Sequence, residues 1–384
     1  MTKKKKILYI CTDPAPGMLP FASKIINTMS QATEDIVLYG IFISQNKFSY
    51  QEYIDKRLQN QNFVFIEAAN NLVFSLIEKF FPYKILKNID AICKEHDIDL
   101  IHCLTTEFCL GYHLNRIQKK IKIIYTVHDL VPHEEFKLNL KTRIISEIIK
   151  RGVKNNLTKL KILATSSKTQ FNQLKIAYPE KLIYYHPFPT LITKQIIEGN
   201  SACPELSKID KYILFFGGIN IYKGVDLLYN TFINDEELYN NFHLVIAGSG
   251  EWYFNRKVEC EKKIIRINRF IHDSEIKNLF EKANCVVYPY ISGTQSGVLS
   301  LAYYFGTPLI TSDIPFFLEN VEHTKTAFVF ERGKAESLNK AIHLAINSRI
   351  DDTFYLNQQL KYKNNYSDES LEKSISNIYE TLII

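Results

Sequence analysis

The stretch CVVYPYISGTQSGVLSLAYYFGTPLITSD, residues 285–313, places a strand, a turn and a helix in close succession. The apolar run 285–290 is typical of a buried parallel strand, and a turn rich in glycine and hydroxyl groups follows it. A helix over 297–305 then ends at Gly306, with Pro308 shortly beyond, before the next apolar run begins. This order predicts a parallel sheet with the turn at the carboxyl end of its strand.

The same alternation of apolar runs and amphipathic segments fills the chain and restarts near Lys211. It predicts an α/β protein with two doubly wound parallel sheets. We expect an N-terminal domain at 1–190, a polar linker at 191–209 and a second domain at 210–365. A C-terminal helix at 366–384 is expected to pack back on the first domain.

Composition narrows the class of protein. The 384 residues carry a net charge of +6, which permits an anionic ligand but lacks the dense basic stripe usual for nucleic-acid binding. The seven cysteines are scattered without a C-x-x-C pair, which disfavours a disulfide framework or a zinc site and favours a reducing cytoplasm. We expect neither a signal peptide nor a spanning helix, because no apolar run approaches about 20 residues.

Two glycine turns follow predicted strands of the second domain. In YILFFGGINIYKGVDLL, Gly217 and Gly218 let backbone N–H groups approach an anion, and Lys223 adds a point charge. An ordinary strand–helix loop with a surface lysine is the alternative. In FHLVIAGSGEW, Gly248 opens a turn that resembles a dinucleotide fingerprint only weakly, because Tyr253 stands where a third glycine is needed.

The turn of the opening stretch carries Ser292, Thr294, Gln295 and Ser296, which precede a helix whose first N–H groups lack partners. These side chains could cap the helix or help to bind an anion. Both interpretations stay open from the sequence.

His128 and Asp129 follow the predicted strand KIIYT of the first domain. His128 could hydrogen-bond a sugar hydroxyl or a phosphate, and Asp129 could orient it or accept a proton. A structural histidine is the alternative. His133 and Glu134 suggest a metal, but their spacing is not that of a zinc helix, so we expect no metal.

In sequence order, the motifs TVHDLVP, FFGGINIYKGVDLL, VIAGSGE, RFIHDSEIKNLFEKANCVVYPY and TQSGVLSLAYYFGTPLITSDI resemble family 4 retaining glycosyltransferases of the GT-B fold. The resemblance covers nearly the whole chain. It implies two facing Rossmann-like domains with an inter-domain cleft, of which the N-terminal one binds the acceptor and the C-terminal one binds the nucleotide-sugar donor. It also implies hexosyltransferase-type transfer of a sugar from a UDP- or GDP-sugar to an acceptor hydroxyl, without a bound metal or other cofactor.

By this resemblance His128, Asp129 and Lys223 are the candidate catalytic residues, with His128 meeting the donor sugar. The resemblance also places thirteen positions at the donor. They are Gly217, Gly218 and Lys223 at the diphosphate, Thr294, Gln295, Ser296, Gly297 and Val298 in a diphosphate loop, Gly248 beside the nucleotide, Phe270 and Ile271 flanking the base, Gly17 in the first strand–helix loop, and Glu319, which matches a family glutamate.

The sequence departs from the family in two places. The family usually has an arginine ahead of its lysine, whereas Gly218 and Asn220 stand here. It often has two glutamates separated by seven residues around the diphosphate loop, and neither frame has a carboxylate here: one falls on Gly293 and Leu301, the other on Thr294 and Ala302. The Thr-Gln-Ser-Gly-Val form is similar to a variant within the family, but it leaves the ribose-binding residue open.

Two segments could meet an anionic membrane, as a lipid-linked acceptor would require. Segment 70–89 mixes aromatic residues with lysines. Segment 137–161 is strongly basic, through Lys137, Lys141, Arg143, Lys150, Arg151, Lys154, Lys159 and Lys161. A solvated basic face is the alternative. A sugar-nucleotide epimerase, a phosphorylase and a non-catalytic partner that binds nucleotide or glycan are the rival functions. The resemblance favours assembly of a bacterial surface polysaccharide, such as capsule or O-antigen, at the inner face of the membrane.

Overall fold

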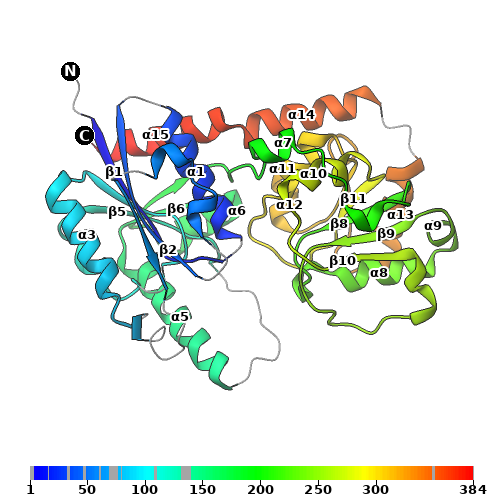
Figure 1. The fold of residues 1–384 in the computed structure, drawn as a ribbon, viewed down its shortest axis with the longest axis horizontal. Helices are drawn as coiled ribbons and strands as arrows, with labels where there is room; N and C mark the ends of the chain where they lie inside the picture. Colours follow the sequence, from blue (N-terminus) through cyan, green and yellow to red (C-terminus); the bar gives the residue numbers. More distant parts are fainter. Residues whose placement is uncertain are drawn as a thin grey trace. The chain divides into compact units, whose positions relative to one another are not determined.

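A computed structural model describes residues 4–15, 17–32, 35–45, 49–59, 62–68, 77–78, 80–107, 110–130, 140–347 and 351–383, and at residues 32 and 140–145 the backbone alone. The chain divides into two compact units (Figure 1). Unit 1 comprises Met1–Pro189 and Asp368–Ile384, and unit 2 comprises Thr190–Ser367. Each unit contains one parallel sheet, which confirms the prediction of two Rossmann-like α/β domains.

Unit 1 has a seven-stranded sheet in the order β3-β2-β1-β4-β5-β6-β7. Its strands are β1 (Lys5–Cys11), β2 (Ile36–Ser44), β3 (Phe63–Glu67), β4 (Leu100–Cys103), β5 (Lys122–Thr126), β6 (Ile162–Thr165) and β7 (Leu182–Tyr185). Its helices are α1 (Met18–Ala32), α3 (Tyr83–His96), α4 (Leu114–Ile117), α5 (Leu140–Lys159), α6 (Lys168–Ala177) and α15 (Asp368–Leu382), with short 3-10 turns η1 (Tyr50–Glu52) and η2 (Lys56–Leu58).

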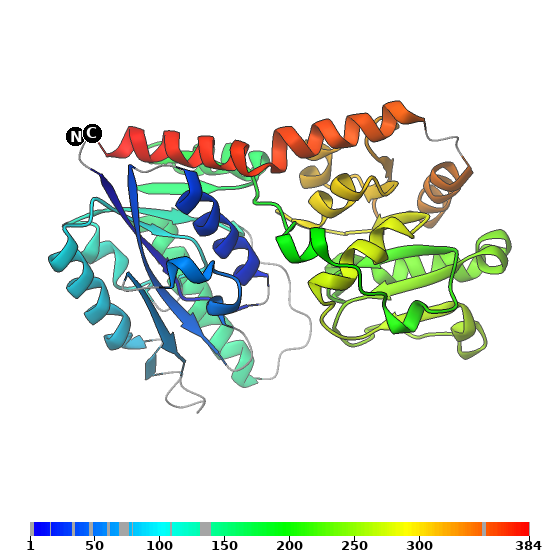
Figure 2. The ribbon, with the colours of Figure 1, turned by 45° about the horizontal axis from the view of Figure 1, so that its top comes forward.

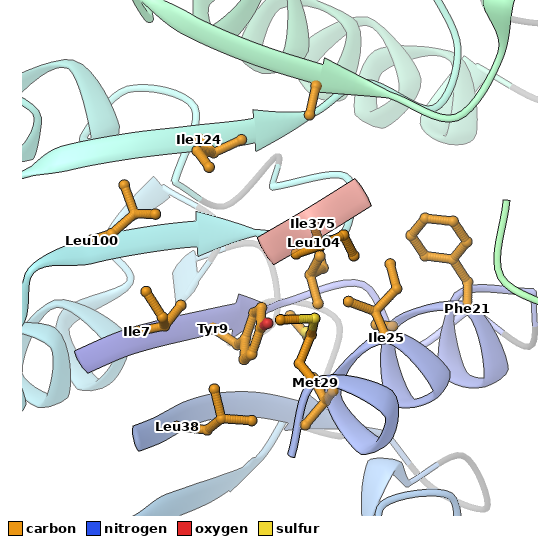
Figure 3. Packing of buried hydrophobic residues seen from close by; sticks show 14 of the residues in the cluster. Ile7, Tyr9, Phe21, Ile25, Met29, Leu38, Leu100, Leu104, Ile124 and Ile375 are labelled. Atoms are coloured by element: carbon orange, nitrogen blue, oxygen red, sulfur yellow. The ribbon is translucent and has the colours of Figure 1, made fainter. Parts of the chain in front are cut away.

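Helices cover both faces of this sheet, which explains why β1 is apolar at consecutive positions. Tyr9 of β1 points to the face covered by α1 and α15, where it joins Met29 and Ile375 in one buried cluster (Figure 3). Its neighbours Leu8 and Ile10 belong to a second cluster on the opposite face, with residues of α3, α4, α5 and α6. Successive side chains of β1 point to opposite faces of the sheet and therefore contribute to two separate cores.

A buried polar network attaches α15 to the sheet. The Tyr379 hydroxyl donates to Tyr9 Oη at 2.9 Å and lies 2.7 Å from His102 Nδ1. His102 Nε2 lies 3.0 Å from Thr126 Oγ1, so the network reaches from β1 to β5. Burial lowers the pKa of His102, which keeps its ring neutral. The C-terminal helix is thus an integral part of the first core.

Unit 2 has a six-stranded parallel sheet in the order β10-β9-β8-β11-β12-β13. Its strands are β8 (Tyr212–Phe216), β9 (His243–Ala247), β10 (Ile264–Ile267), β11 (Cys285–Tyr288), β12 (Leu309–Ser312) and β13 (Phe328–Phe330). Its helices are α7 (Lys194–Glu198), α8 (Val225–Asn234), α9 (Glu236–Asn241), α10 (Asp273–Glu281), α11 (Val298–Phe305), α12 (Pro315–Asn320), α13 (Ala335–Asn347) and α14 (Asp352–Tyr366), with 3-10 turns η3 (Pro204–Leu206), η4 (Ile221–Lys223) and η5 (Val258–Lys263). Figure 2 shows α14 running along its unit beside α11, which it contacts.

Segment 191–209, which the sequence predicts to be a linker, is packed within unit 2. It contains α7, which contacts α10. The Thr193 hydroxyl donates to Asp273 Oδ2 at 2.7 Å, and the Leu191 N–H donates to Ser300 Oγ at 3.1 Å. These bonds tie the start of the unit to α10 and α11. Among the described residues, no helix combines the length and the apolar character needed to cross a bilayer.

The packing of α15 gives a stability prediction. We expect Ile375→Ala to lower the free energy of unfolding of unit 1 by about 2–5 kcal/mol, because Ile375 is fully buried against α1 and β1. Denaturant unfolding followed by circular dichroism measures this change. Lys373→Ala, at an exposed position of the same helix, is the control and should change stability little. Equal stability of the two variants would contradict the role given to α15.

Candidate active site

The strand order of unit 2 reverses between β8 and β11, since the chain goes from β8 outward to β10 and returns beyond β8 to β11. In open parallel sheets ligands bind outside the carboxyl ends of the strands at such a reversal. Here that place is formed by the turns after β8, β9 and β11. Most of the predicted donor residues lie in these turns.

The turns after β8 and β9 pack against each other so closely that they exclude side chains. Gly217 and Gly248 have φ values of 134° and 143°, which L-residues with side chains rarely adopt. A Cβ atom at Gly248 would lie 2.2 Å from the Gly217 carbonyl oxygen. The Gly217 N–H in turn donates to the Ala247 carbonyl at 2.9 Å. Glycine at 248 is therefore required to set the shape of this site.

Lys223 closes the turn after β8, and its ammonium lies over the glycines. The Nζ atom would be 3.0 Å from a Cβ built on Gly217, and it lies 5.8 Å and 5.6 Å from the ring centres of Tyr222 and Tyr290. These distances allow cation–π attraction. Among the described residues, no hydrogen bond or ion pair is recorded for this ammonium, and burial lowers its pKa to about 8. The site thus holds a partly buried cation that no carboxylate of the described residues neutralises.

The turn after β11 is fastened to the turn that carries Lys223. The Ile291 N–H donates to the Tyr222 carbonyl at 2.7 Å, and a Cβ at Gly224 would lie 2.1 Å from the Pro289 carbonyl oxygen. The side chain of Tyr290, between these two contacts, is buried, and burial raises the pKa of its hydroxyl. The sequence did not single out Tyr290, because an aromatic residue ending an apolar run looks like core packing.

The predicted diphosphate loop follows. Thr294, Gln295 and Ser296 are half-buried, and α11 begins at Val298 with Gly297 in the capping position. Because glycine has no side chain, no hydroxyl caps this helix from that position. The sequence left open whether these polar residues cap the helix or bind an anion. In the structure the N-cap residue is Gly297, so none of the three is the N-cap.

The remaining predicted donor residues of unit 2 differ in exposure. Phe270 lies in the turn after β10 with 54% of its surface exposed, whereas the adjacent Ile271 is buried in the core. Arg269 braces this turn, because its guanidinium binds Glu275 through two hydrogen bonds of 2.7 Å and also pairs with Glu205. Phe270 is therefore the member of the predicted pair that can offer a ring to a base. Glu319 is half-buried in α12, at its fifth residue.

In unit 1 the predicted residues are Gly17, His128 and Asp129. His128 follows β5, is buried, packs edge-on against Phe21 at 4.8 Å and places Nε2 at 2.8 Å from the Leu104 carbonyl oxygen. A carbonyl only accepts, so Nε2 carries the proton and Nδ1 is the ring's acceptor. Burial lowers the pKa of His128, which favours this neutral form. Gly17 is exposed, and a Cβ there would meet nothing within 4 Å, so the fold of unit 1 does not itself require glycine.

Glu107 is the feature that sequence reasoning missed. It lies beyond β4, at the point where the strand order of unit 1 reverses between β1 and β4, and its side chain is fully buried. The Thr12 hydroxyl donates to Oε2 at 2.5 Å, and the Thr105 hydroxyl and the Thr12 N–H donate to Oε1 at 2.6 Å and 3.3 Å. Burial raises the pKa of Glu107 to about 8, because these neutral donors offset only part of the lost hydration.

Some predicted features lie outside the described residues. They include His133, Glu134 and Lys137, together with residues 70–76 of the aromatic segment; for Lys141 and Arg143 only the backbone is described. Within the described residues, no group of three or more histidine, cysteine, aspartate or glutamate side chains is arranged to hold a metal ion.

The comparisons with known proteins bear on the class of protein. Residues 201–366, which include all the turns of the unit 2 site, match the family of glycosyl transferases group 1. A relative from Haemophilus influenzae, named an uncharacterized glycosyltransferase, is 24% identical over 367 residues and is covered over 94% of each chain. The match of residues 201–366 and the relative over nearly the whole chain both agree with the prediction that the chain is a glycosyltransferase.

Solved structures show the same fold over nearly the whole chain. HepE of Anabaena, in complex with UDP-glucose, aligns with a TM-score of 0.68 at 14% identity, covering 98% of this chain and 99% of its own. WaaG, a glycosyltransferase involved in lipopolysaccharide biosynthesis, aligns with a TM-score of 0.63 at 14% identity, covering 97% and 99%. At these identities the likeness concerns the fold, and it agrees with the expected GT-B class of two Rossmann-like domains.

The burial of Glu107 gives a pH prediction. Between its ordinary pKa of 4.5 and its raised value near 8, the unfolded chain releases the proton that the native state retains. The free energy of unfolding should therefore fall as pH rises through this window, by roughly 1 kcal/mol per pH unit from this group. Glu107→Gln should remove that contribution when denaturant unfolding is measured from pH 5 to 8. The exposed Glu52→Gln serves as the control, and parallel pH profiles for Glu107→Gln and wild type would contradict the assignment.

Proposed function

We propose that the chain transfers a sugar from a nucleoside diphosphate donor, a UDP- or GDP-sugar, to a hydroxyl of a glycan or lipid-linked acceptor. The observation that carries this proposal is the Lys223 ammonium, which lies over the glycine turns and is not paired with a carboxylate of the described residues. A diphosphate would supply the missing negative charge at the reversal of the strand order. The complex of HepE with UDP-glucose supports a nucleotide sugar as donor.

The chemistry of the proposed reaction centres on the leaving group. Cleavage of the bond between the sugar and the diphosphate develops negative charge on phosphate oxygens, and pre-positioned positive groups lower the barrier most. Lys223 would supply a full charge, and N–H groups at the start of α11 would add their dipoles, with the Thr294 and Ser296 hydroxyls as further donors. In this scheme the protein's own cation performs the task that a metal ion performs in other transferases.

We further propose that the transfer retains the anomeric configuration. In such a transfer the leaving phosphate accepts the proton of the attacking hydroxyl, so no carboxylate nucleophile is needed. His128, which the Leu104 carbonyl holds in place through Nε2, would meet the donor sugar. Asp129 follows His128 directly in the chain and would orient bound hydroxyls.

The proposed setting is the assembly of a bacterial surface polysaccharide at the cytoplasmic face of the membrane. The fold that this chain shares with WaaG agrees with this setting. Before and at the start of α3, Phe81 and Tyr83 are exposed, and Lys84 and Lys87 are exposed beside them. Exposed aromatic rings with lysines suit a peripheral contact with anionic lipid. The exposed cations of α5, Lys150, Arg151 and Lys154, would add to this attraction.

Proton uptake tests the role of Lys223. A bound diphosphate stabilises the ammonium, so UDP binding at pH 8.5 should take up most of one proton, and affinity should fall as pH rises above 8. Titration calorimetry in two buffers of different ionisation enthalpy measures this uptake. Lys223→Met should bind UDP more weakly and without proton uptake, whereas the exposed Lys340→Met should behave as wild type. UDP binding without proton uptake in the wild type would refute the assignment.

A donor screen tests the reaction itself. We expect at least one UDP- or GDP-sugar to raise the unfolding temperature and to release its nucleoside diphosphate, by transfer or by slow hydrolysis, in a reaction that Lys223→Met slows at least tenfold. Nucleotide release is read by a coupled assay. An epimerase would convert the sugar without releasing nucleotide, and a non-catalytic partner would bind without any product. Either result would overturn the proposed function.

A further inference from the structure

Arg269 is the centre of a charged cluster in the turn after β10 of unit 2. Its guanidinium donates two hydrogen bonds of 2.7 Å to the two oxygens of Glu275, the third residue of α10. It donates two more, of 3.0 Å and 3.1 Å, to the two oxygens of Glu205 in η3. The side chain of Glu275 is only 7% exposed, while those of Arg269 and Glu205 are 32% and 34% exposed. A planar guanidinium that binds two carboxylates in this bidentate way is held in one orientation.

The same cluster fixes the backbone that carries Phe270. The guanidinium of Arg269 also donates to the Phe270 carbonyl at 3.4 Å, and Glu275 Oε2 accepts from the His272 N–H at 3.1 Å. The backbone at Phe270 and just beyond it is therefore bonded to side chains of one cluster. The Phe270 ring itself is more than half exposed. An aromatic ring that stays exposed on a fixed turn is available to stack on a planar ligand.

The turn after β10 is connected to the turns that carry Lys223. The Gly248 N–H, in the turn after β9, donates to the Ile267 carbonyl at the end of β10 at 3.0 Å. Gly248 packs in turn against Gly217, over which the Lys223 ammonium lies. The Phe270 ring and the ammonium therefore belong to one connected set of turns. A change in the turn after β10 would alter the separation between ring and cation, which a nucleotide has to match with its base and its phosphates.

The charges of the cluster argue against direct binding of phosphate by Arg269. Hydrogen bonds from Arg269 hold the pKa of the Glu205 and Glu275 carboxyls below their usual range, so both are ionised at neutral pH. One guanidinium between two carboxylates leaves the cluster with a net negative charge, which repels an anion. A contribution of Arg269 to nucleotide binding would therefore come through the turn that it holds.

We propose that Arg269 is a positioning residue for the nucleobase of the donor: it holds Phe270 so that the ring stacks on the base while the diphosphate lies at Lys223. The inference rests on the proposed function, because it takes a nucleoside diphosphate as the ligand. Stacking of a base on an aromatic side chain contributes roughly fivefold to a hundredfold to affinity. A ring on a turn that is already ordered delivers more of this gain, because less conformational entropy is lost on binding.

Calorimetric titrations with UDP, GDP and pyrophosphate separate the base from the phosphates. Arg269→Lys keeps the charge but loses the planar fork, so affinity for the preferred nucleotide should fall about five- to tenfold while pyrophosphate affinity stays unchanged. Phe270→Ala removes the ring and should lower nucleotide affinity at least as much. The double variant should bind the nucleotide no more weakly than Phe270→Ala alone, because Arg269 acts through this ring. Glu205→Gln, which weakens the cluster from its more exposed side, should give a smaller loss of the same kind.

Lys361→Gln is the control, because it breaks another ion pair of unit 2, the 2.9 Å pair between Lys361 in α14 and Glu322. This variant should bind nucleotide and pyrophosphate as the wild type does. Equal losses of nucleotide and pyrophosphate affinity in Arg269→Lys and Glu205→Gln would overturn the inference, and so would additive losses in the double variant or unchanged nucleotide affinity in both single variants. A wild type that binds neither UDP nor GDP would instead refute the proposed function.

Discussion

The unit 2 site depends on one constraint, the close packing of the turns after β8 and β9. The two turns lie so close together that a Cβ atom does not fit between them. Only glycine at 248 allows the Gly217 carbonyl to come so close. Gly217 has a φ of 134°, which residues with a side chain rarely adopt, and a Cβ there would also press on the Lys223 ammonium. A larger residue at either position would separate the turns or displace the cation. The glycines therefore matter less for flexibility than for the space they leave. Without side chains, they leave room for a charged group beside the backbone.

Two buried titratable groups occupy corresponding places in the two units. Lys223 and Glu107 each lie in a turn at the carboxyl edge of a parallel sheet where the strand order reverses. Burial moves both pKa values to about 8, downward for the ammonium and upward for the carboxyl, because each charged form loses hydration. Groups whose charged form has lost its hydration in this way are found mainly at binding and catalytic sites. Among the described residues no anion pairs with Lys223 and no cation pairs with Glu107, so the two sites suit different ligands.

The fold could be predicted from the sequence because buried parallel strands are continuous apolar runs that end in small or polar residues. The turns at Gly217, Gly248 and Thr294 were found for the same reason. Glu107 escaped prediction, because its burial depends on Thr12, 95 positions away, and a glutamate in TTEF has the pattern of a surface loop. The packing of segment 191–209 depends likewise on contacts with α10 that no local pattern reveals.

The packing of α11 explains why the second of the two family glutamates is missing. The positions where the glutamate motif would end, Leu301 and Ala302, are fully buried, and α11 packs on α14. A carboxylate at either position would lose its hydration without gaining a partner, which costs several kcal/mol. The Ser300 hydroxyl is already committed to the Gly297 carbonyl and the Leu191 N–H. The two inner positions of α11 are therefore closed to a polar ligand, whereas the residues just before the helix are half-buried and Phe270 is exposed.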